Sequence, residues 1–286
     1  MESHKLAKII CLSISLAMVA MLLYYLADAY SKGYGWSLYL YAVTAIPIPV
    51  SIYLGLREGD DQKKIASVIA LSVVLVILAN LPRAAHLIEI GVKPSDLSAV
   101  GEYDQILSSA IFFAILFIPS MAIASIEGEG LRGGLKSLGL KPGEGIISSV
   151  SWGLLITVIT FAVVMIAQTI MILVSGYMGH EILTENPVAE QISSSLLLVV
   201  TLPVLAGVSE EIFFRGVLQP RFGIMAQAVI FGLAHTAYLV PQQVILPMIM
   251  AVVWGWTYRV TGDLRIVITA HVAYDFIVMS LLYFLG

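Results

Sequence analysis

Residues 196–215 of the chain read LLLVVTLPVLAGVSEEIFFR, in which fourteen uncharged residues precede two glutamates, three apolar residues and an arginine. The apolar run is typical of a membrane-spanning helix, and it predicts a fold built from such helices. An ionisable side chain at bilayer depth costs about 2.5–3.5 kcal/mol on insertion scales, so its presence there points to a function. Glu210, Glu211 and Arg215 are therefore the first candidates for a functional site.

The composition of the whole chain is that of a membrane protein. Its 286 residues are 59% hydrophobic and 12% charged, with a mean hydropathy of +0.95, whereas soluble domains carry about 25% charged residues. We expect an all-α fold, a polytopic bundle of about eight or nine helices in the lipid bilayer of the cell membrane. No basic stripe supports nucleic-acid binding. Cys11 is the only cysteine, which excludes a disulfide framework and a cysteine-based metal site.

Nine apolar runs have the length of a membrane-spanning helix, or nearly so. They cover residues 9–27, 36–56, 65–81, 106–126, 146–174, 192–217, 223–239, 241–258 and 266–285. The runs at 65–81 and 223–239 are short, which leaves the count at eight or nine. The first run, of about 19 residues, exceeds the roughly 7–15 of a signal-peptide core, so we expect it to be retained as a helix.

The positions of the basic residues distinguish between these two counts. If nine helices alternate across the membrane from a cytosolic N-terminus, all but three of the fifteen Lys and Arg residues fall on the cytosolic side. The exceptions are Lys32, Arg83 and Lys93. This asymmetry follows the positive-inside rule, and it favours nine helices with a cytosolic N-terminus and an outside C-terminus.

A Gly-rich, basic stretch separates two groups of helices. We predict that residues 1–127 form four N-terminal helices, residues 128–145 a cytosolic connector, and residues 146–286 a catalytic core of about five helices. A G-x-G-x-x-G match in the connector follows an apolar helix and not a strand, so it does not indicate a dinucleotide site.

Two further polar islands follow the glutamates in the same apolar background. His235 lies four residues after Phe231, and Asp275 lies four residues after His271. Residues four apart share a helix face, so the members of each pair can meet, as can the second glutamate and the arginine of the first island. Measured from the arginines that flank these helices, all three islands lie roughly 9–20 Å inside the cytosolic boundary. A common depth is what one shared site requires.

Each island taken alone also has a purely structural explanation. A single ion pair or histidine in a membrane helix is more often a packing device or an interhelical hydrogen-bond partner than a catalytic group. Three islands within about 66 residues each carry an insertion cost, which favours one functional site. A basic carboxylate beside an imidazole can deprotonate a water for attack on a carbonyl, and donors on another helix can stabilise the oxyanion. The set therefore supports hydrolysis.

The three motifs together resemble those of the CAAX prenyl protease and bacteriocin-processing (CPBP, or Abi) intramembrane protease family. Within residues 146–286 they stand in the same order on separate apolar segments, as E-E-x-x-x-R, F-x-x-x-H and H-x-x-x-D. The resemblance implies an intramembrane endopeptidase that hydrolyses a peptide bond near the cytosolic face. It also implies C-terminal processing of a prenylated protein as one class of substrate.

Carried over by position, the resemblance implies a role for each residue of the motifs. Glu210 and His235 activate the attacking water, and Glu211 and Arg215 brace the site. The last motif binds the oxyanion.

His271 and Asp275 are the oxyanion-binding pair that the resemblance implies. Family members commonly have asparagine or aspartate at the last position, and an aspartic acid donates a hydrogen bond only when it is protonated. An ionised Asp275 would instead orient His271. We predict the neutral donor, because no other basic residue lies on the same helix segment to offset a buried negative charge.

Three alternatives remain open at this point. Glu210, His235 and His271 could form a zinc site with two histidines, one carboxylate and an open position, although the chain has no complete H-E-x-x-H motif. A non-catalytic membrane scaffold or immunity protein could retain the fold, but the completeness of the motifs argues against it. A transporter with a proton relay would require repeat symmetry or paired broken helices. We predict metal-free hydrolysis without a cofactor, with a protein or peptide substrate as the partner.

Overall fold

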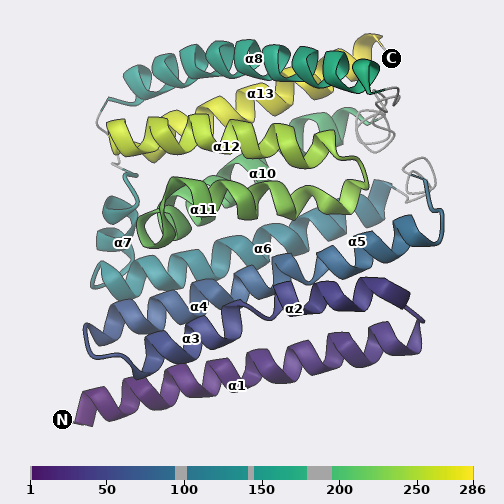
Figure 1. The fold of residues 1–286 in the computed structure, drawn as a ribbon. Helices are drawn as coiled ribbons and strands as arrows, with labels where there is room; N and C mark the ends of the chain where they lie inside the picture. The colour runs from purple at the N-terminus through teal and green to yellow at the C-terminus, as the bar shows by residue number, and fades with distance from the viewer. Residues whose placement is uncertain (1, 94–101, 141–144, 179–194, 286) are drawn as a thin grey trace. The chain divides into compact units, whose positions relative to one another are not determined.

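The computed structural model describes residues 2–93, 102–140, 145–178 and 195–285, and within these ranges every regular element is a helix (Figure 1). The predicted all-α fold is thereby confirmed. The chain divides into two compact units. The N-terminal unit comprises Met1–Val92 and Ile118–Ser137, and the C-terminal unit comprises Lys93–Phe117 and Leu138–Gly286.

The N-terminal unit is built from long apolar helices interrupted by short turns. Its elements are α1 (Glu2–Ser31), η1 (Gly35–Leu40), α2 (Tyr41–Thr44), α3 (Pro47–Leu56), α4 (Asp61–Leu78), α5 (Asn80–Glu89), the second part of α6 (Glu102–Glu127) and α7 (Leu131–Ser137). Asp60 caps α4, because its carboxylate accepts hydrogen bonds from the backbone N–H groups of Gln62 and Lys63. With α5, α4 makes one continuous candidate span, Asp61–Glu89. The short apolar run at 65–81 therefore belongs to a helix of ample length.

The C-terminal unit carries all the predicted site residues. Its elements after α6 are α8 (Ile146–Tyr177), α10 (Leu196–Glu211), the π-helical segment η3 (Ile212–Leu218), α11 (Gln219–Ala234), the 3-10 turn η4 (His235–Tyr238), α12 (Gln242–Thr261) and α13 (Leu264–Leu285).

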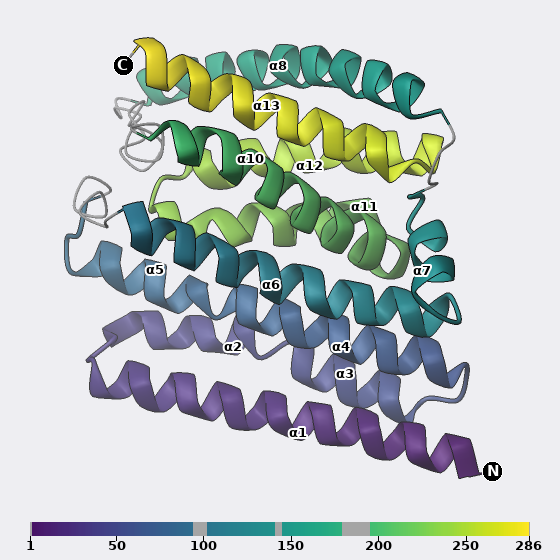
Figure 2. The ribbon, with the colours of Figure 1, turned by 180° about the vertical axis from the view of Figure 1, so that it is seen from behind.

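Within the described residues, eight helices are long and apolar enough to cross a membrane. One of them, Leu196–Tyr238, has 43 residues, about twice the number that a bilayer requires. It is broken at Gly223, where φ is 83° and ψ is 172°, a conformation that only glycine adopts readily. Figures 1 and 2 show that α10 and the part of α11 after this break run in opposite directions. The chain is thus a multi-pass membrane protein, and the reversal accounts for the predicted count of eight or nine helices.

Close approaches hold α13 against two other helices of the C-terminal unit. At Gly207 of α10, an added Cβ would lie 2.6 Å from a methyl group of Val272, so only glycine lets the two helices come this near. On α8, the hydroxyl of Thr157 shares its hydrogen between the carbonyl of Gly153 on the same helix, over 3.0 Å, and that of Ala270 on α13, over 3.3 Å. These contacts fix α13 beside α10 and α8, and with it the segment that contains His271.

The Gly-rich stretch predicted as a connector, residues 128–145, contains the short helix α7 in its first half. Residues 141–144 of this stretch lie outside the described ranges. The division into segments 1–127, 128–145 and 146–286 stays a prediction.

Candidate active site

The first motif lies where a regular helix becomes a π-helix. Glu210 and Glu211 end α10, and η3 begins at Ile212. Single π-helical turns are rare and are frequent at functional sites. Arg215, on η3, donates from Nη1 to Glu211 Oε1 over 2.8 Å, and both side chains are fully buried. The pair that the four-residue spacing predicts is therefore present.

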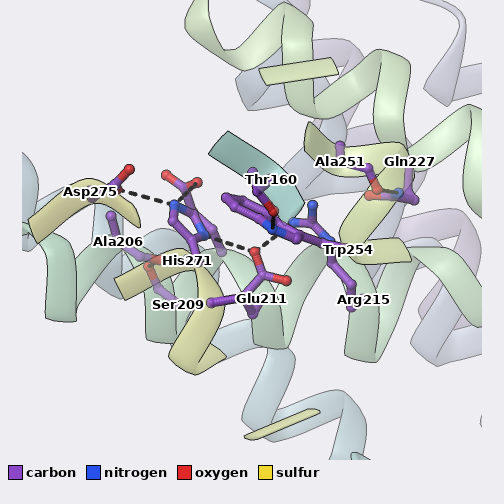
Figure 3. A network of polar contacts seen from close by, with 12 residues as sticks. Thr160, Ala206, Ser209, Glu211, Arg215, Gln227, Ala251, Trp254, His271 and Asp275 are labelled. Carbon is purple, nitrogen blue, oxygen red and sulfur yellow. Dashed lines mark hydrogen bonds and ion pairs between the residues drawn. The ribbon is translucent and has the colours of Figure 1, made fainter. Parts of the chain in front are cut away.

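His271 is the centre of the polar network. Its Nδ1 lies 2.8 Å from Glu211 Oε1, and its Nε2 lies 3.2 Å from Asp275 Oδ2 (Figure 3). The same Nε2 is 4.0 Å from Glu210 Oε2. The contacts to Glu210 and Glu211 join α13 to α10, and they connect motifs that lie about 60 residues apart in the sequence.

The carboxyl groups differ in how far they can be reached from outside the protein. The Glu211 side chain is 0% exposed, that of Glu210 is 11% exposed, and that of Asp275 is 23% exposed. Glu211 is enclosed with Arg215, so it can hold other side chains but cannot meet a substrate. Glu210 and Asp275 are the two carboxyl groups that a substrate or water can approach.

His235 begins the 3-10 turn η4, and its side chain folds back on α11. Its Nδ1 lies 2.8 Å from the backbone carbonyl oxygen of Phe231. A carbonyl can only accept, so Nδ1 carries the hydrogen and the Nε2 lone pair of the neutral imidazole remains available. A histidine held in this tautomer can take a proton from a water.

The ring of Phe231 brings His235 into the same group as the other motif residues. Its centroid is 4.9 Å from the His235 ring, 6.1 Å from the His271 ring and 4.6 Å from the Cζ atom of Arg215. In the described part of the chain no ion pair joins His235 to Glu210, so the contact through Phe231 is what ties the second motif to the network.

Arg215 is held by aromatic faces as well as by its carboxylate. Its Nε and Nη2 atoms are buried without a hydrogen-bond partner. The guanidinium instead lies over the rings of Phe231 and Trp254, with Cζ 4.6 Å and 5.3 Å from the two centroids. Cation–π contacts of this kind are favourable for a desolvated guanidinium.

Trp254 is a site residue that the sequence did not single out. Its fully buried indole stacks on the imidazole of His271, with the centroids 4.5 Å apart and the planes at 28°. A tryptophan in an apolar helix gives the same pattern whether it packs in a core or against a catalytic group, so the sequence held no signal for this contact.

The zinc alternative requires at least three donors that converge on one point. Among the described residues, no group of three His, Cys, Asp or Glu side chains is placed to hold a metal ion. Both ring nitrogens of His271 face carboxyl oxygens. The donors of the zinc alternative are therefore not gathered in this arrangement, and hydrolysis without a metal stays a prediction.

A segment of the chain that contains these residues is similar to known proteins. Residues 192–277 match the family model described as "Type II CAAX prenyl endopeptidase Rce1-like". The uncharacterized protein YpbD of Bacillus subtilis (strain 168) is 34% identical over 79 residues, which are 27% of this chain and 41% of that protein. The match thus spans less than half of the curated relative. No solved structure matches the chain.

The matched segment contains all three motifs and every residue that they predict for the site. It leaves out α1 to α8. The resemblance to the CAAX prenyl protease family, which the motifs predict from the sequence, is thereby confirmed for residues 192–277.

Proposed function

We propose that this chain is an intramembrane endopeptidase that hydrolyses a peptide bond with a water activated by Glu210 and His235. The observation that carries the proposal is the convergence of three motifs, distant in sequence, on one network around His271 and Phe231. The family match over the same residues supports a peptide hydrolase.

Glu210 and His235 deprotonate the water, because both can accept a proton and both can be approached from outside the protein. The Nε2 atom of His235 offers a lone pair, because its Nδ1–H is donated to the Phe231 carbonyl. Glu210 is the reachable glutamate of the first motif. A carboxylate and an imidazole that share one water can orient it and remove its proton during attack on the scissile carbonyl.

The remaining residues of the motifs support this step. Glu211 accepts from both Arg215 and His271 through a single oxygen, so it fixes the positions of the cation and the imidazole. We place His271 and Asp275 at the oxyanion of the tetrahedral intermediate, with the buried His271 held in the network and Asp275, 23% exposed, on its more accessible side. Donors fixed before the reaction require little reorganisation in the transition state.

The substrate we propose is a peptide, and the first candidate is the prenylated C-terminal segment of a protein. This candidate comes from the description of the matching family and from the resemblance of the motifs. A lipid-modified peptide would reach a site within the bilayer from the membrane itself.

The orientation we propose has the N-terminus in the cytosol, the C-terminus outside and the site open to the cytosolic side. The distribution of basic residues supports it. Reporter fusions at the two termini should report opposite sides of the membrane. Fusions that place both termini on one side would contradict the nine-helix arrangement.

The catalytic proposal is tested with purified protein and a pair of peptides, one farnesylated at a C-terminal CAAX sequence and one unmodified. Wild type should cleave, and Glu210→Gln and His235→Gln should each abolish cleavage without loss of folded protein. Glu58→Gln, which changes an exposed acid in the turn before α4, serves as the control. Wild type that cleaves neither peptide would favour the non-catalytic scaffold.

The metal alternative is tested on the same preparation. Cleavage should persist after exhaustive chelation. About one zinc per chain, lost together with the activity, would instead establish a metalloprotease.

A further inference from the structure

The position of the His271 ring is fixed only in part by its polar contacts. Its nitrogens face Glu211 and Asp275, which lie on opposite sides of the ring. These two contacts set the direction of the line through Nδ1 and Nε2. They leave the ring free to tilt about that line, because a hydrogen bond at each end acts as a hinge. A flat partner on the ring face is needed to remove the tilt.

Trp254 supplies this partner from α12. Its indole lies on the His271 ring at a centroid distance of 4.5 Å and an interplanar angle of 28°. The indole is 0% exposed and cannot move aside without disturbing the surrounding packing. It also packs nearly perpendicular to the ring of Phe231, with the two centroids 6.4 Å apart. The indole is therefore held within the group of residues that form the site.

The orientation of the indole is in turn set by Thr160 on α8. Trp254 Nε1 donates to Thr160 Oγ1 over 3.0 Å, and Figure 3 shows the two residues beside His271. The Thr160 hydroxyl donates its own hydrogen to the carbonyl of Ile156 over 2.8 Å. Since its only hydrogen is engaged there, the oxygen faces the indole with a lone pair, and the bond to Trp254 has one direction.

We propose that Trp254 and Thr160 are positioning residues for His271, which makes α8 a part of the catalytic unit. The inference rests on the proposed function, since it concerns the histidine that we place at the oxyanion. Thr160 lies outside residues 192–277, the segment that matches the family model. The matched segment is therefore insufficient on its own for full activity.

The test compares substitutions that remove the contact with matched substitutions elsewhere on the same helices. Thr160→Val deletes the acceptor with almost no change in shape, Thr160→Ser restores it, and Trp254→Phe removes the indole N–H. Thr169→Val is the control on α8, because this exposed hydroxyl also donates to the carbonyl four residues earlier. Trp256→Phe is the control on α12, where the indole is 60% exposed.

Turnover of the cleaved peptide is the first readout. Thr160→Val should lower kcat by about tenfold with KM nearly unchanged, because a tilted His271 weakens an interaction made in the transition state. Thr160→Ser should recover most of kcat, and both controls should match wild type. In the Trp254→Phe background, Thr160→Val should not lower kcat further, because the indole N–H that donates to Thr160 is already absent.

Histidine ¹⁵N NMR in detergent micelles gives a readout that does not depend on activity. Thr160→Val should move the ring ¹⁵N signals of His271, assigned with a His271→Gln variant, whereas Thr169→Val should leave them in place. Unmoved signals together with unchanged kcat would overturn the positioning role. If wild type cleaves no peptide but the signals still move, the proposed function fails while the positioning of His271 stands.

Discussion

The two compact units bury polar side chains of different kinds. In the N-terminal unit these are mainly hydroxyls. Ser15 donates to the carbonyl of Cys11 over 2.9 Å and lies 2.7 Å from the hydroxyl of Ser51, which donates to Ile48. Among the described residues of this unit, Lys64 is the one buried charged side chain, and it stands in the first turn of α4.

The C-terminal unit instead buries charges well inside a span. Glu210, Glu211, Arg215 and His271 are all buried, and they are joined across helices. A hydroxyl can be satisfied by the carbonyl of its own helix, so it serves packing at little cost. A buried charge requires a partner from elsewhere, and removing that partner is expensive. The contrast assigns packing to the buried hydroxyls of the first unit and chemistry to the buried charges of the second.

The largest effect on stability is expected for Glu211→Ala. The substitution leaves the guanidinium of Arg215 and Nδ1 of His271 without their shared acceptor, and breaking a buried pair in this way costs about 3–5 kcal/mol. Thermal unfolding in detergent should show the loss. Glu210→Ala is the matched control and should unfold near the wild-type temperature, because its nearest basic atom is 4.0 Å away. Normal stability of Glu211→Ala with no activity would exchange the roles of the two glutamates.

The next effect concerns the protonation state of Asp275. If its carboxyl is neutral and donates a hydrogen bond, Asp275→Asn should keep most of the activity, because an amide donates the same bond. Asp275→Leu deletes the donor and should lower kcat by about 10²–10³. Peptide cleavage by the two variants and wild type checks this. An inactive Asp275→Asn that folds normally would show that the charge is required to orient His271.

Much of this contrast could be predicted from the sequence because it depends on local spacing. Helical periodicity brings residues four apart together, and the Glu211–Arg215 and His271–Asp275 contacts are both present. The hydropathy pattern likewise predicts the all-α fold and a count of eight or nine helices. The second of the two short runs, at 223–239, is a separate helix only because Gly223 breaks the chain direction, and one glycine among many does not indicate such a break.

The contacts across helices could not be predicted in the same way. The estimated depth of the three motifs below the membrane surface predicts that they share one layer. Depth alone does not predict which side-chain atoms are in contact. His271 lies 2.8 Å from Glu211 and 4.0 Å from Glu210, and which glutamate is nearer depends on how α10 is rotated about its axis. The stacking of Trp254 on His271 depends on helix packing alone, as does its bond to Thr160 on α8.

A smaller effect is expected in the N-terminal unit. Ser15→Ala removes the hydrogen bond to the Cys11 carbonyl and the contact with the Ser51 hydroxyl, but it leaves Ser51 donating to Ile48. The free energy of unfolding should therefore fall by about 0.5–1.5 kcal/mol. Thermal unfolding under the conditions used for Glu211→Ala allows a direct comparison, and peptide cleavage should stay at the wild-type level. A loss of stability as large as that of Glu211→Ala would remove the distinction between hydroxyls and charges.

The smallest effect concerns an ion pair at the end of a span. Asp263 lies in the turn between α12 and α13, where its carboxylate accepts from Arg265 over 2.7 Å and 2.8 Å and from Ser149 over 2.7 Å. Burial tends to raise the pKa of Asp263, but the hydrogen bonds from Arg265 and Ser149 outweigh it and leave the pKa below its ordinary value. The side chain is 16% exposed, and a pair at such an edge contributes up to about 1 kcal/mol.

The lowered pKa of Asp263 gives this pair a pH signature. A carboxyl whose pKa is lower in the folded state stabilises the fold fully above its unfolded pKa of about 3.9, and this stabilisation is lost as the pH falls through the folded value. Asp263→Asn should therefore unfold slightly earlier than wild type at neutral pH and match it in strong acid. Thermal unfolding from neutral to acidic pH checks this. If the unfolding temperatures of Asp263→Asn and wild type differ by the same amount at every pH, Asp263 acts as an uncharged cap of α13. The acid at the edge of the span would then have a structural role that does not depend on its charge.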